Sequence, residues 1–259
     1  DNDKNIIKEW TSSYNPGNSV YFLENGTLMR TANTGSTEFS AGGAGGRVEQ
    51  YDWQGNLIWA YDYDTANYRQ HHDIEVLPNG NILMIAWQLK TQAEAEAAGR
   101  NPALISEGEL WPDSVIEVAP TGNYGGTIVW EWHVWDHLIQ DYSASKDNYG
   151  TVADHPEKID LNHTMSGANA GIADWNHINS IDYNAELDQI LLSVHNSSEI
   201  WIINHNTTTA EAAGAAGDLL YRWGNPAAYD PGSTSDQKLF VQHDAKWIES
   251  HLPGAGNIL

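Results

Sequence analysis

The sequence predicts an all-β fold, and two observations carry this prediction. Short runs of β-branched and aromatic residues recur along the chain, each bounded by turn residues, which is the pattern of β-strands. Twelve Trp and twelve Tyr stand against three Phe, and such amphipathic aromatics suit packed β-structure whose polar tips reach water. At 259 residues with 41% hydrophobic content, the chain is long enough to bury a substantial core.

The strand phrases recur in the same order. The first phrase is two aliphatic residues, two variable residues and then Trp or Tyr: "IIKEW" at 6–10, "LIWAY" at 57–61, "IVWEW" at 128–132 and "LLYRW" at 219–223. The second phrase is a strand, a turn and the start of another strand: "NSVYFLENGTLM" at 18–29, "HDIEVLPNGNILM" at 72–84, "NSIDYNAELDQILL" at 179–192 and "HDAKWIESHLPGAGNIL" at 243–259. A third strand phrase leads into the next unit: "RVEQYD" at 47–52, "SVIEVA" at 114–119 and "EIWIIN" at 199–204. The Asn-Gly pairs of the second phrase predict hairpin turns.

Each unit therefore corresponds to about four antiparallel strands, and tandem four-stranded units are typical of the blades of a β-propeller. A long β-sandwich is the alternative, and repetition of the phrases themselves favours the propeller. We expect one domain over residues 1–259 that contains about four blades. Both ends interrupt a unit, because 1–3 begin in a turn and 256–259 stop inside a strand. We therefore expect a chain truncated at both ends.

Three insertions lengthen successive units. They lie at 89–113, 133–176 and 224–242, and "TQAEAEAAGR" at 91–100 predicts a short helix in the first of them.

Charge and composition exclude several functions. The 12 basic and 35 acidic residues give a net charge of −23, which argues against a nucleic-acid partner, whose phosphates need a basic surface. No run of about 18 apolar residues is present, so we expect no membrane insertion. The absence of cysteine excludes disulfides and thiol chemistry.

Alignment of the units predicts a polar site. Asn18, His72, Asn179 and His243 occupy one repeated position, and His177 lies two residues before Asn179, hence on the same strand face. Equivalent positions of successive blades surround the central channel of a propeller. A lone histidine at a strand start is more often a satisfied polar residue, but repetition favours a functional site here.

The remaining polar motifs are weaker. Asp73 and Asp244 each follow a repeated-position histidine, so we expect them to anchor backbone. His133 and His137 are four apart, which suits zinc ligands or simple packing beside tryptophans; without a third ligand no metal is predicted. Arg222 either neutralises an anion or is a solvated edge charge. The glycine-rich run "AGGAGG" at 41–46 lacks the Lys-Ser/Thr ending of a phosphate loop.

With these motifs the sequence resembles the arylsulfotransferase family of exported β-propeller enzymes. The matching stretches are "HHDIEVLPNGNIL", "IVWEWHVWDHLIQD", "DWNHINSIDYNAELDQILLSV", "DLLYRWGNP" and "QHDAKWI", and they reach from near residue 5 to the end of the chain. The resemblance implies six blades in the complete protein. It also implies transfer of a sulfuryl group from an aryl sulfate to a phenol acceptor, without a cofactor.

The same resemblance implies residue roles. His243 is expected to be transiently sulfurylated, while His72, His177 and Asn179 bind and polarise the sulfuryl oxygens. The family usually carries Arg where this chain has His195, so a permanent charge is replaced by a titratable ring. The substrate-binding candidates are His195, Arg222, Asn18 and His71. A periplasmic or secreted location is implied as well, and a homo-oligomer or extracellular assembly stays open.

Sulfuryl transfer suits these residue types, because a neutral imidazole can attack sulfur and a second histidine can protonate the leaving phenolate. Two alternatives stay open. The first is a non-catalytic propeller that binds a ligand or builds an extracellular assembly, and the missing Arg favours it. The second is a propeller enzyme of other chemistry, such as a lyase or a quinone-dependent dehydrogenase, which has no positive support in the sequence.

Overall fold

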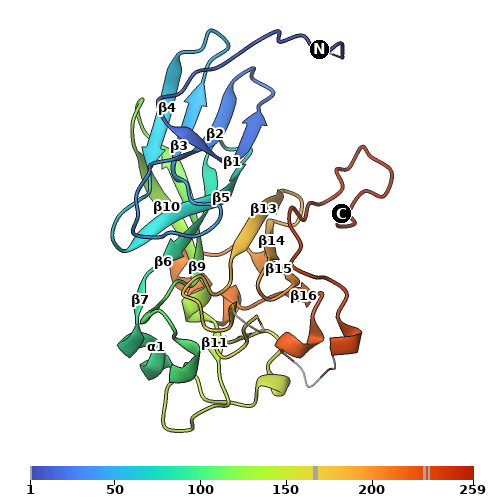
Figure 1. Cartoon of the computed structure of the whole chain (residues 1–259). Helices are drawn as coiled ribbons and strands as arrows, with labels where there is room; N and C mark the ends of the chain where they lie inside the picture. The colour runs from blue at the N-terminus through green and yellow to red at the C-terminus, as the bar shows by residue number, and fades with distance from the viewer. Residues whose placement is uncertain (1, 166–168, 230–231, 233) are drawn as a thin grey trace.

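The protein is built around three four-stranded antiparallel sheets (Figure 1). The computed structural model describes residues 2–165, 169–229, 232 and 234–259. The first sheet contains β1 (Asn15–Phe22), β2 (Leu28–Asn33), β3 (Gly46–Tyr51) and β4 (Leu57–Asp62). The second contains β5 (Tyr68–Val76), β6 (Ile82–Gln88), β9 (Asp113–Pro120) and β10 (Gly126–His133). The third contains β13 (Ile178–Asn184), β14 (Gln189–Val194), β15 (Glu199–Asn204) and β16 (Tyr221–Trp223).

Every sheet follows chain order, so each is a meander, and the predicted all-β class of antiparallel four-stranded units is confirmed. The described residues hold three complete sheets, where the sequence predicted about four units. The fourth set of phrases lies at the two ends of the chain. Residues 6–10 form no strand, and 243–259 contribute only an isolated bridge between Trp247 and Ile258. A strand needs a hydrogen-bonded neighbour, and neither end segment has a complete one here.

The first strands of the three sheets lie next to one another. β5 packs against β1 on one side and against β13 on the other. This arrangement gathers residues that are far apart in the sequence along one edge of each sheet.

The core fills the two spaces between the sheets. On β6, Ile82 and Met84 join the core cluster shared with the first sheet, whereas Leu83 and Ile85 join the cluster shared with the third. Successive residues of a strand point to opposite faces, so the second sheet is buried on both. This burial explains why β6 reads as an unbroken apolar run.

The predicted Asn-Gly hairpins have a specific geometry. In the first hairpin the amide of Leu23 donates to the carbonyl of Thr27 at 2.8 Å, and Gly26 has φ +79°. The second hairpin repeats the pattern with Leu77, Asn81 and Gly80 at φ +86°. A left-handed residue after a turn of this kind favours glycine, since glycine carries no Cβ to clash.

The insertions, and the connection between β15 and β16, carry short elements outside the three four-stranded sheets. The predicted helix is confirmed as α1 (Gln92–Ala98), with a capping box between Thr91 and Glu94 and a left-handed Gly99 at its C-terminus. The others are β7 (Lys90–Thr91), η1 (Pro102–Leu104), β8 (Glu109–Leu110), η2 (Val134–Asp136), β11 (Leu138–Ile139), η3 (Val152–Asp154), β12 (Ile159–Asp160), α2 (Thr209–Ala212), η5 (Ala215–Gly217), η6 (Pro226–Ala228) and η7 (Thr234–Asp236). In the described part of the chain, no helix combines the length and apolar character needed to cross a bilayer.

Candidate functional site

In each of the three four-stranded sheets, the repeated polar position lies in a β-bulge. The pairing register shifts between Pro16 and Val20 in β1, between Gln70 and Ile74 in β5, and between Ile178 and Ser180 in β13. Asn18, His72 and Asn179 lie inside these three shifts. A bulge bends its strand and changes the direction of a side chain, and it is often found beside active sites.

Two histidines of the site have left-handed backbones. His72 has φ +48° and His177 has φ +53°, a conformation that costs about 1–2 kcal/mol for a residue with a Cβ. His177 also precedes β13, which begins at Ile178. The alternation of side chains along β13 therefore does not explain where His177 lies, as the sequence analysis had assumed. The turn that precedes the strand determines the position of His177. Strain of this kind concentrates at functional sites.

The histidines form a continuous series, which we call the histidine cluster: His72, His177, His195 and His243. The ring centroids of His72 and His177 are 4.6 Å apart, those of His177 and His195 are 4.9 Å apart, and those of His195 and His243 are 5.1 Å apart. The structure brings His72, His177 and His243 together, as the aligned repeats led us to expect, and His195 lies between the rings of His177 and His243.

The histidine cluster borders three cavities in the described part of the chain. One of about 480 Å³ is lined by Asn18, His72, Asn179 and His243, and we call it the substrate cavity. A second, of about 310 Å³, is lined by His177 and His195, and a third, of about 590 Å³, has His243 in its lining. The cluster thus has open space on more than one side.

Residues 242–246 form no strand. Side chains of β13 hold the backbone around His243 in place instead. The Nδ2 of Asn179 donates to the carbonyl of Gln242 at 2.8 Å. Ser180 Oγ accepts from the amide of Ala245 at 3.0 Å, and Asp182 Oδ2 accepts from the amide of Trp247 at 2.7 Å. His243 itself is exposed. The segment therefore presents an accessible imidazole on a backbone fixed at several points.

Asp174 increases the basicity of His177. Its Oδ2 contacts His177 Nδ1, and its Oδ1 accepts from Trp87 Nε1 at 2.8 Å. Burial lowers the pKa of His177, but the hydrogen bond and the charge of Asp174 outweigh this effect, so the pKa is raised overall. His177 is thus suited to carry positive charge beside an anion.

His72 and His195 are held neutral. Burial, together with the neighbouring rings of His71 and His177, lowers the pKa of His72 to about 2. Burial and the charges of His177 and His243 also lower the pKa of His195, against the raising effect of its hydrogen bond to Asn196. The Nδ1 of His195 lies 2.6 Å from Asn196 Oδ1, so Nδ1 carries the proton and donates it.

His71 lines none of these three cavities, so the prediction that it contacts substrate is wrong. Its side chain is fully buried and stacks on Trp87 at a centroid distance of 3.9 Å. Its Nδ1 lies 2.9 Å from Nδ1 of His72, and its Nε2 lies 2.7 Å from Oδ1 of Asp113. His71 therefore stands behind His72.

Arg222 is not brought to the histidine cluster either. It lies on β16, where its guanidinium bonds both carboxylate oxygens of Glu199 at 2.9 and 2.5 Å and the carbonyl of Lys158 at 2.8 Å. The arginine is buried, and its ring neighbour is Tyr229 at 4.3 Å. Neither the free anion site nor the solvated edge charge is correct, because Arg222 forms a buried ion pair.

Asp73 anchors backbone, as predicted. Its carboxylate accepts from the amides of Ile74 at 2.9 Å and Ile181 at 3.2 Å, and from the hydroxyl of Tyr21 at 2.5 Å. One side chain thereby joins β1, β5 and β13. Asp244 is exposed, and it lines the substrate cavity instead.

The glycine-rich run at 41–46 has a role that the sequence analysis missed. The carbonyl of Gly43 accepts from the amide of His72 at 2.7 Å. A Cβ on Gly43 would lie 2.1 Å from the His72 ring, and Gly43 has φ +81°. Only glycine, which has no Cβ, allows the backbone of this loop to pack so closely against the imidazole. The consecutive glycines, which do not form a phosphate loop, were the sequence feature that could have indicated such a close backbone approach.

His133 and His137 bind different carboxylates. His133 Nε2 lies 2.9 Å from Glu131, whereas the buried His137 contacts Asp218 at 2.8 Å and stacks on Trp132 at 5.2 Å. For His137 the packing interpretation is confirmed. Over the described residues, no group of three or more His, Asp or Glu side chains is arranged to hold a metal ion.

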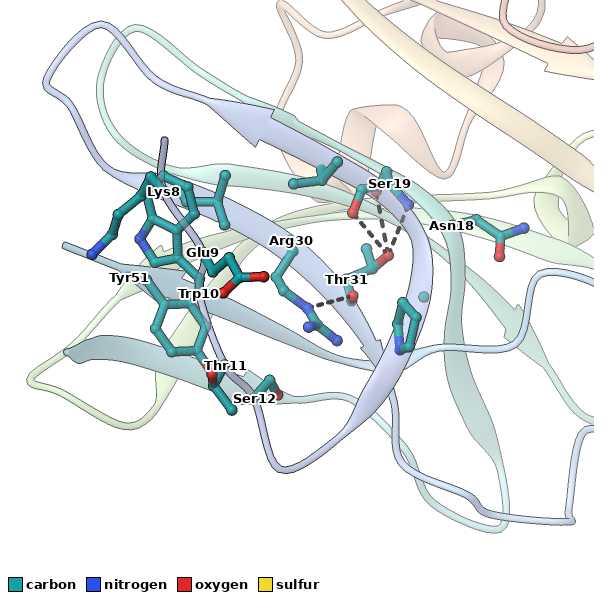
Figure 2. Close-up of a pocket in the computed structure, with 14 residues that line it drawn as sticks. Lys8, Glu9, Trp10, Thr11, Ser12, Asn18, Ser19, Arg30, Thr31 and Tyr51 are labelled. Atoms are coloured by element: carbon teal, nitrogen blue, oxygen red, sulfur yellow. Dashed lines mark hydrogen bonds between the residues drawn. The ribbon is translucent and has the colours of Figure 1, made fainter. Parts of the chain in front are cut away.

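A further cavity of about 510 Å³ lies beside the first sheet (Figure 2). It is lined by residues 8–12, which include Trp10, and by Arg30 and Tyr51. Asn18 lies at the opposite end of the cavity from Trp10. Asn18 also lines the substrate cavity. Of the predicted site residues, only Asn18 reaches this cavity.

The fold and the site define an all-β protein of four-stranded meanders with a histidine-lined cavity at their first strands. Its family follows from sequence comparison, because the family profile described as Arylsulfotransferase (ASST) matches residues 3–250. The chain belongs to the arylsulfotransferase family. No curated protein matches the sequence.

Solved structures resemble the chain at low sequence identity. A protein of unknown function from Bacteroides caccae is 12% identical with a TM-score of 0.41, covering 86% of this chain and 51% of that one. Kuenenia stuttgartiensis hydrazine synthase is 10% identical with a TM-score of 0.42, covering 88% and 51%. The Cps50 (Swd1) β-propeller domain from Myceliophteria thermophila is 10% identical with a TM-score of 0.37, covering 89% and 47%. The chain spans about half the length of these structures.

Proposed function

We propose that this protein is an aryl-sulfate sulfotransferase that works without a nucleotide and passes through a sulfohistidine. Membership of the arylsulfotransferase family supports the reaction class. The observation that carries the proposal is the histidine cluster, in which the accessible ring of His243 stands at the end of a series of imidazoles beside the substrate cavity.

In the first half-reaction, a ring nitrogen of His243 attacks the sulfur of the aryl sulfate. The N–S bond forms as the bond between sulfur and the phenolic oxygen breaks, and the leaving oxygen takes a proton from His72. In the second half-reaction, an acceptor phenol loses its proton to His72. Its oxygen then attacks the same sulfur and releases His243.

Charge on the sulfuryl oxygens needs fixed partners. His177 provides a cationic ring, because its pKa is raised by Asp174. The amide of Asn179 uses one N–H on Gln242 and retains the other for the substrate. Preorganised donors of this kind are worth roughly 3–4 kcal/mol each in the transition state.

The test uses the full-length protein, a chromogenic aryl sulfate and a phenol acceptor, with His243→Ala as the variant. We expect sulfate transfer that depends on the acceptor and is lost in the variant. Mass spectrometry of the wild-type protein quenched with donor alone should then find one sulfuryl group on His243. A folded protein that never turns over any aryl sulfate would contradict the proposal.

A non-catalytic binding protein is the second candidate, and one observation favours it. His195 stands where the family usually has Arg and is neutral, so the site lacks a permanent charge. Binding of an aryl sulfate measured by calorimetry, without turnover and without a covalent adduct, would support this candidate over the enzyme.

We also propose that the three sheets are part of a closed propeller with six blades in the complete protein, which is periplasmic or secreted. The adjacent first strands and the two inter-sheet cores support this architecture. The test is a structure of the complete protein. A ring of another blade number, or an open stack of sheets, would contradict it, and sedimentation would show whether it forms a homo-oligomer.

A further inference from the structure

Three buried groups stand in line behind the substrate cavity. Asp113 Oδ1 lies 2.7 Å from His71 Nε2, and His71 Nδ1 lies 2.9 Å from His72 Nδ1. Asp113 and His71 have no exposed side-chain surface. With Nδ1 of His72 engaged by His71, its Nε2 is the ring nitrogen left for the substrate cavity, which His72 lines. The series therefore connects a carboxyl group without solvent access to the cavity surface.

Hydrogen bonding permits two proton arrangements in this series. If Asp113 is ionised, His71 donates from Nε2, His72 donates from Nδ1 to His71, and Nε2 of His72 is an acceptor toward the cavity. If Asp113 is protonated, it donates to Nε2 of His71, which donates from Nδ1 to His72. Nε2 of His72 then carries a proton. The two arrangements differ by one proton and by the role of His72.

A single neutral histidine could not play both roles by itself in this position. Protonation of His72 to imidazolium is disfavoured, since burial and neighbouring rings lower its pKa to about 2. Burial also raises the pKa of Asp113 well above its usual range, despite the hydrogen bond from the amide of Ile178 at 2.8 Å. The extra proton of the second arrangement therefore resides on the carboxyl group of Asp113.

We propose that Asp113 and His71 are a proton relay that lets His72 act first as a neutral acid and then as a neutral base. This inference rests on the proposed sulfotransferase function. His72 touches the reacting phenol, whereas His71 and Asp113 are positioning residues that act through it. Neither of them contacts the substrate cavity.

The proton balance closes over the two half-reactions. When the donor is cleaved, the Nε2 proton of His72 moves to the leaving phenolate oxygen. The Nδ1 proton of His71 moves to Nδ1 of His72, and the Asp113 proton moves to Nε2 of His71. The negative charge that left the phenolate now sits on Asp113. When the acceptor phenol attacks, its proton enters at Nε2 of His72, and the same transfers run in reverse.

Neighbouring groups fix the orientations of His72, His71 and Asp113. The carbonyl of Gly43 accepts from the amide of His72, and Trp87 stacks on the ring of His71 at 3.9 Å. The amide of Ile178 donates to the second oxygen of Asp113, so Oδ1 is left for His71. Each member of the series therefore has one fixed orientation, which a directional proton transfer requires.

Asp113→Asn is the sharpest test. The amide oxygen of Asn would face the N–H of Ile178, and its NH₂ would donate permanently to Nε2 of His71. His72 would then keep its Nε2 proton, because giving it up would leave an imidazolate at His71. We expect kcat to fall by about 10²–10⁴-fold for an aryl sulfate whose phenol is weakly acidic, with KM nearly unchanged.

Leaving-group dependence separates a relay from a structural defect. An aryl sulfate with a strongly acidic phenol, such as a nitrophenol, departs without protonation, so Asp113→Asn should barely slow the first half-reaction with this donor. His71→Gln, which removes the ring that links Asp113 to His72, should behave in the same way. An equal loss in the rate of phenol release in the first half-reaction with both donors in a folded variant, or no loss with either donor, would overturn the relay.

Asp218→Asn is the matched control. Asp218 also pairs with a buried histidine, His137, at 2.8 Å, but it lies outside the histidine cluster. We expect this variant to lose stability while retaining wild-type kcat on both donors. Circular dichroism and thermal melting of all variants establish that they are folded.

A readout on the unmodified protein covers the case in which Asp113→Asn does not fold. Infrared difference spectra between the free enzyme and the enzyme sulfurylated by a donor with a weakly acidic phenol should show loss of a protonated carboxyl band as Asp113 ionises. Absence of this band in an enzyme that forms the adduct would overturn the relay. A wild-type protein that forms no adduct and turns over no donor would instead contradict the proposed function itself, so the two failures are distinguishable.

Discussion

Neighbouring groups set the charge of each ring in the histidine cluster. The pKa of His177 is raised because Asp174 lies against it, whereas the pKa values of His72 and His195 are lowered by burial and by other imidazoles. One cluster thus contains a cationic ring beside neutral ones. Anion binding and proton transfer need this division, since a row of imidazolium rings would repel itself.

His195 predicts an unusual pH dependence. Its pKa is lowered, so the ring becomes charged only below the ordinary histidine range. We expect KM for the aryl sulfate to fall as pH decreases through this region, because protonated His195 attracts the anion. In His195→Arg the charge is permanent, and steady-state kinetics should show a KM that is lower and nearly independent of pH. A wild-type KM that rises on acidification would contradict this role.

Gly43 predicts a position at which one methyl group disturbs the site. In Gly43→Ala the added Cβ would lie 2.1 Å from the His72 ring, on a backbone with φ +81°. We expect a kcat at least ten-fold lower, because His72 must move. Gly42→Ala is the matched control, since its Cβ would meet His177 at an ordinary 3.7 Å. Equal kinetics for the two variants would show that the close contact is unimportant.

At the scale of elements, the first strands were predicted correctly while their bulges were not. Alternating apolar residues predict a strand from local periodicity. A bulge is a local loss of pairing register, and it depends on the partner strand and on what packs beside it. The repeated polar position was therefore found in the sequence, but the reason that its side chains meet was visible only in three dimensions.

Asp73 is the link on which the three first strands depend. In Asp73→Ala the amides of Ile74 and Ile181 would lose their acceptor in a buried region. Each unsatisfied buried group costs about 1–3 kcal/mol, so we expect the free energy of unfolding in urea to fall by about 2–5 kcal/mol. Asp244→Ala, at the equivalent but exposed position, should change it by less than about 0.5 kcal/mol. A loss of similar size in both variants would refute the linking role.

For the whole molecule, Glu75 and His205 make the free energy of unfolding depend on pH. Burial, with the nearby carboxylates of Asp182 and Asp73, raises the pKa of Glu75 to about 8 from 4.5, against the lowering effect of Lys246. Burial lowers the pKa of His205, yet its hydrogen bonds to Glu117 and Asp188 raise it overall. Both groups bind more protons in the folded state than in the unfolded state.

The sign of the effect follows from proton linkage. Where the folded state holds extra protons, the free energy of unfolding decreases as pH rises. For Glu75 the window runs from 4.5 to about 8, and for His205 the loss occurs as pH rises through its folded pKa. We expect Glu75→Gln to reduce this decline and to be more stable than wild type near the upper limit, by on the order of 1 kcal/mol or more. Urea titrations across the window would measure it, and an unchanged slope would refute it.

The sequence by itself determined the all-β class, the four-stranded units and the convergence of His72 and His243, because periodicity and tandem repetition can be read along the chain, while the family resemblance added His195. It could not assign His71, Arg222 or Gly43. The role of each depends on one distant neighbour: Asp113, Glu199 and His72 respectively. Only tertiary packing decides which carboxylate a buried cation meets and how closely a backbone approaches a ring, since these contacts join strands and loops from different parts of the chain.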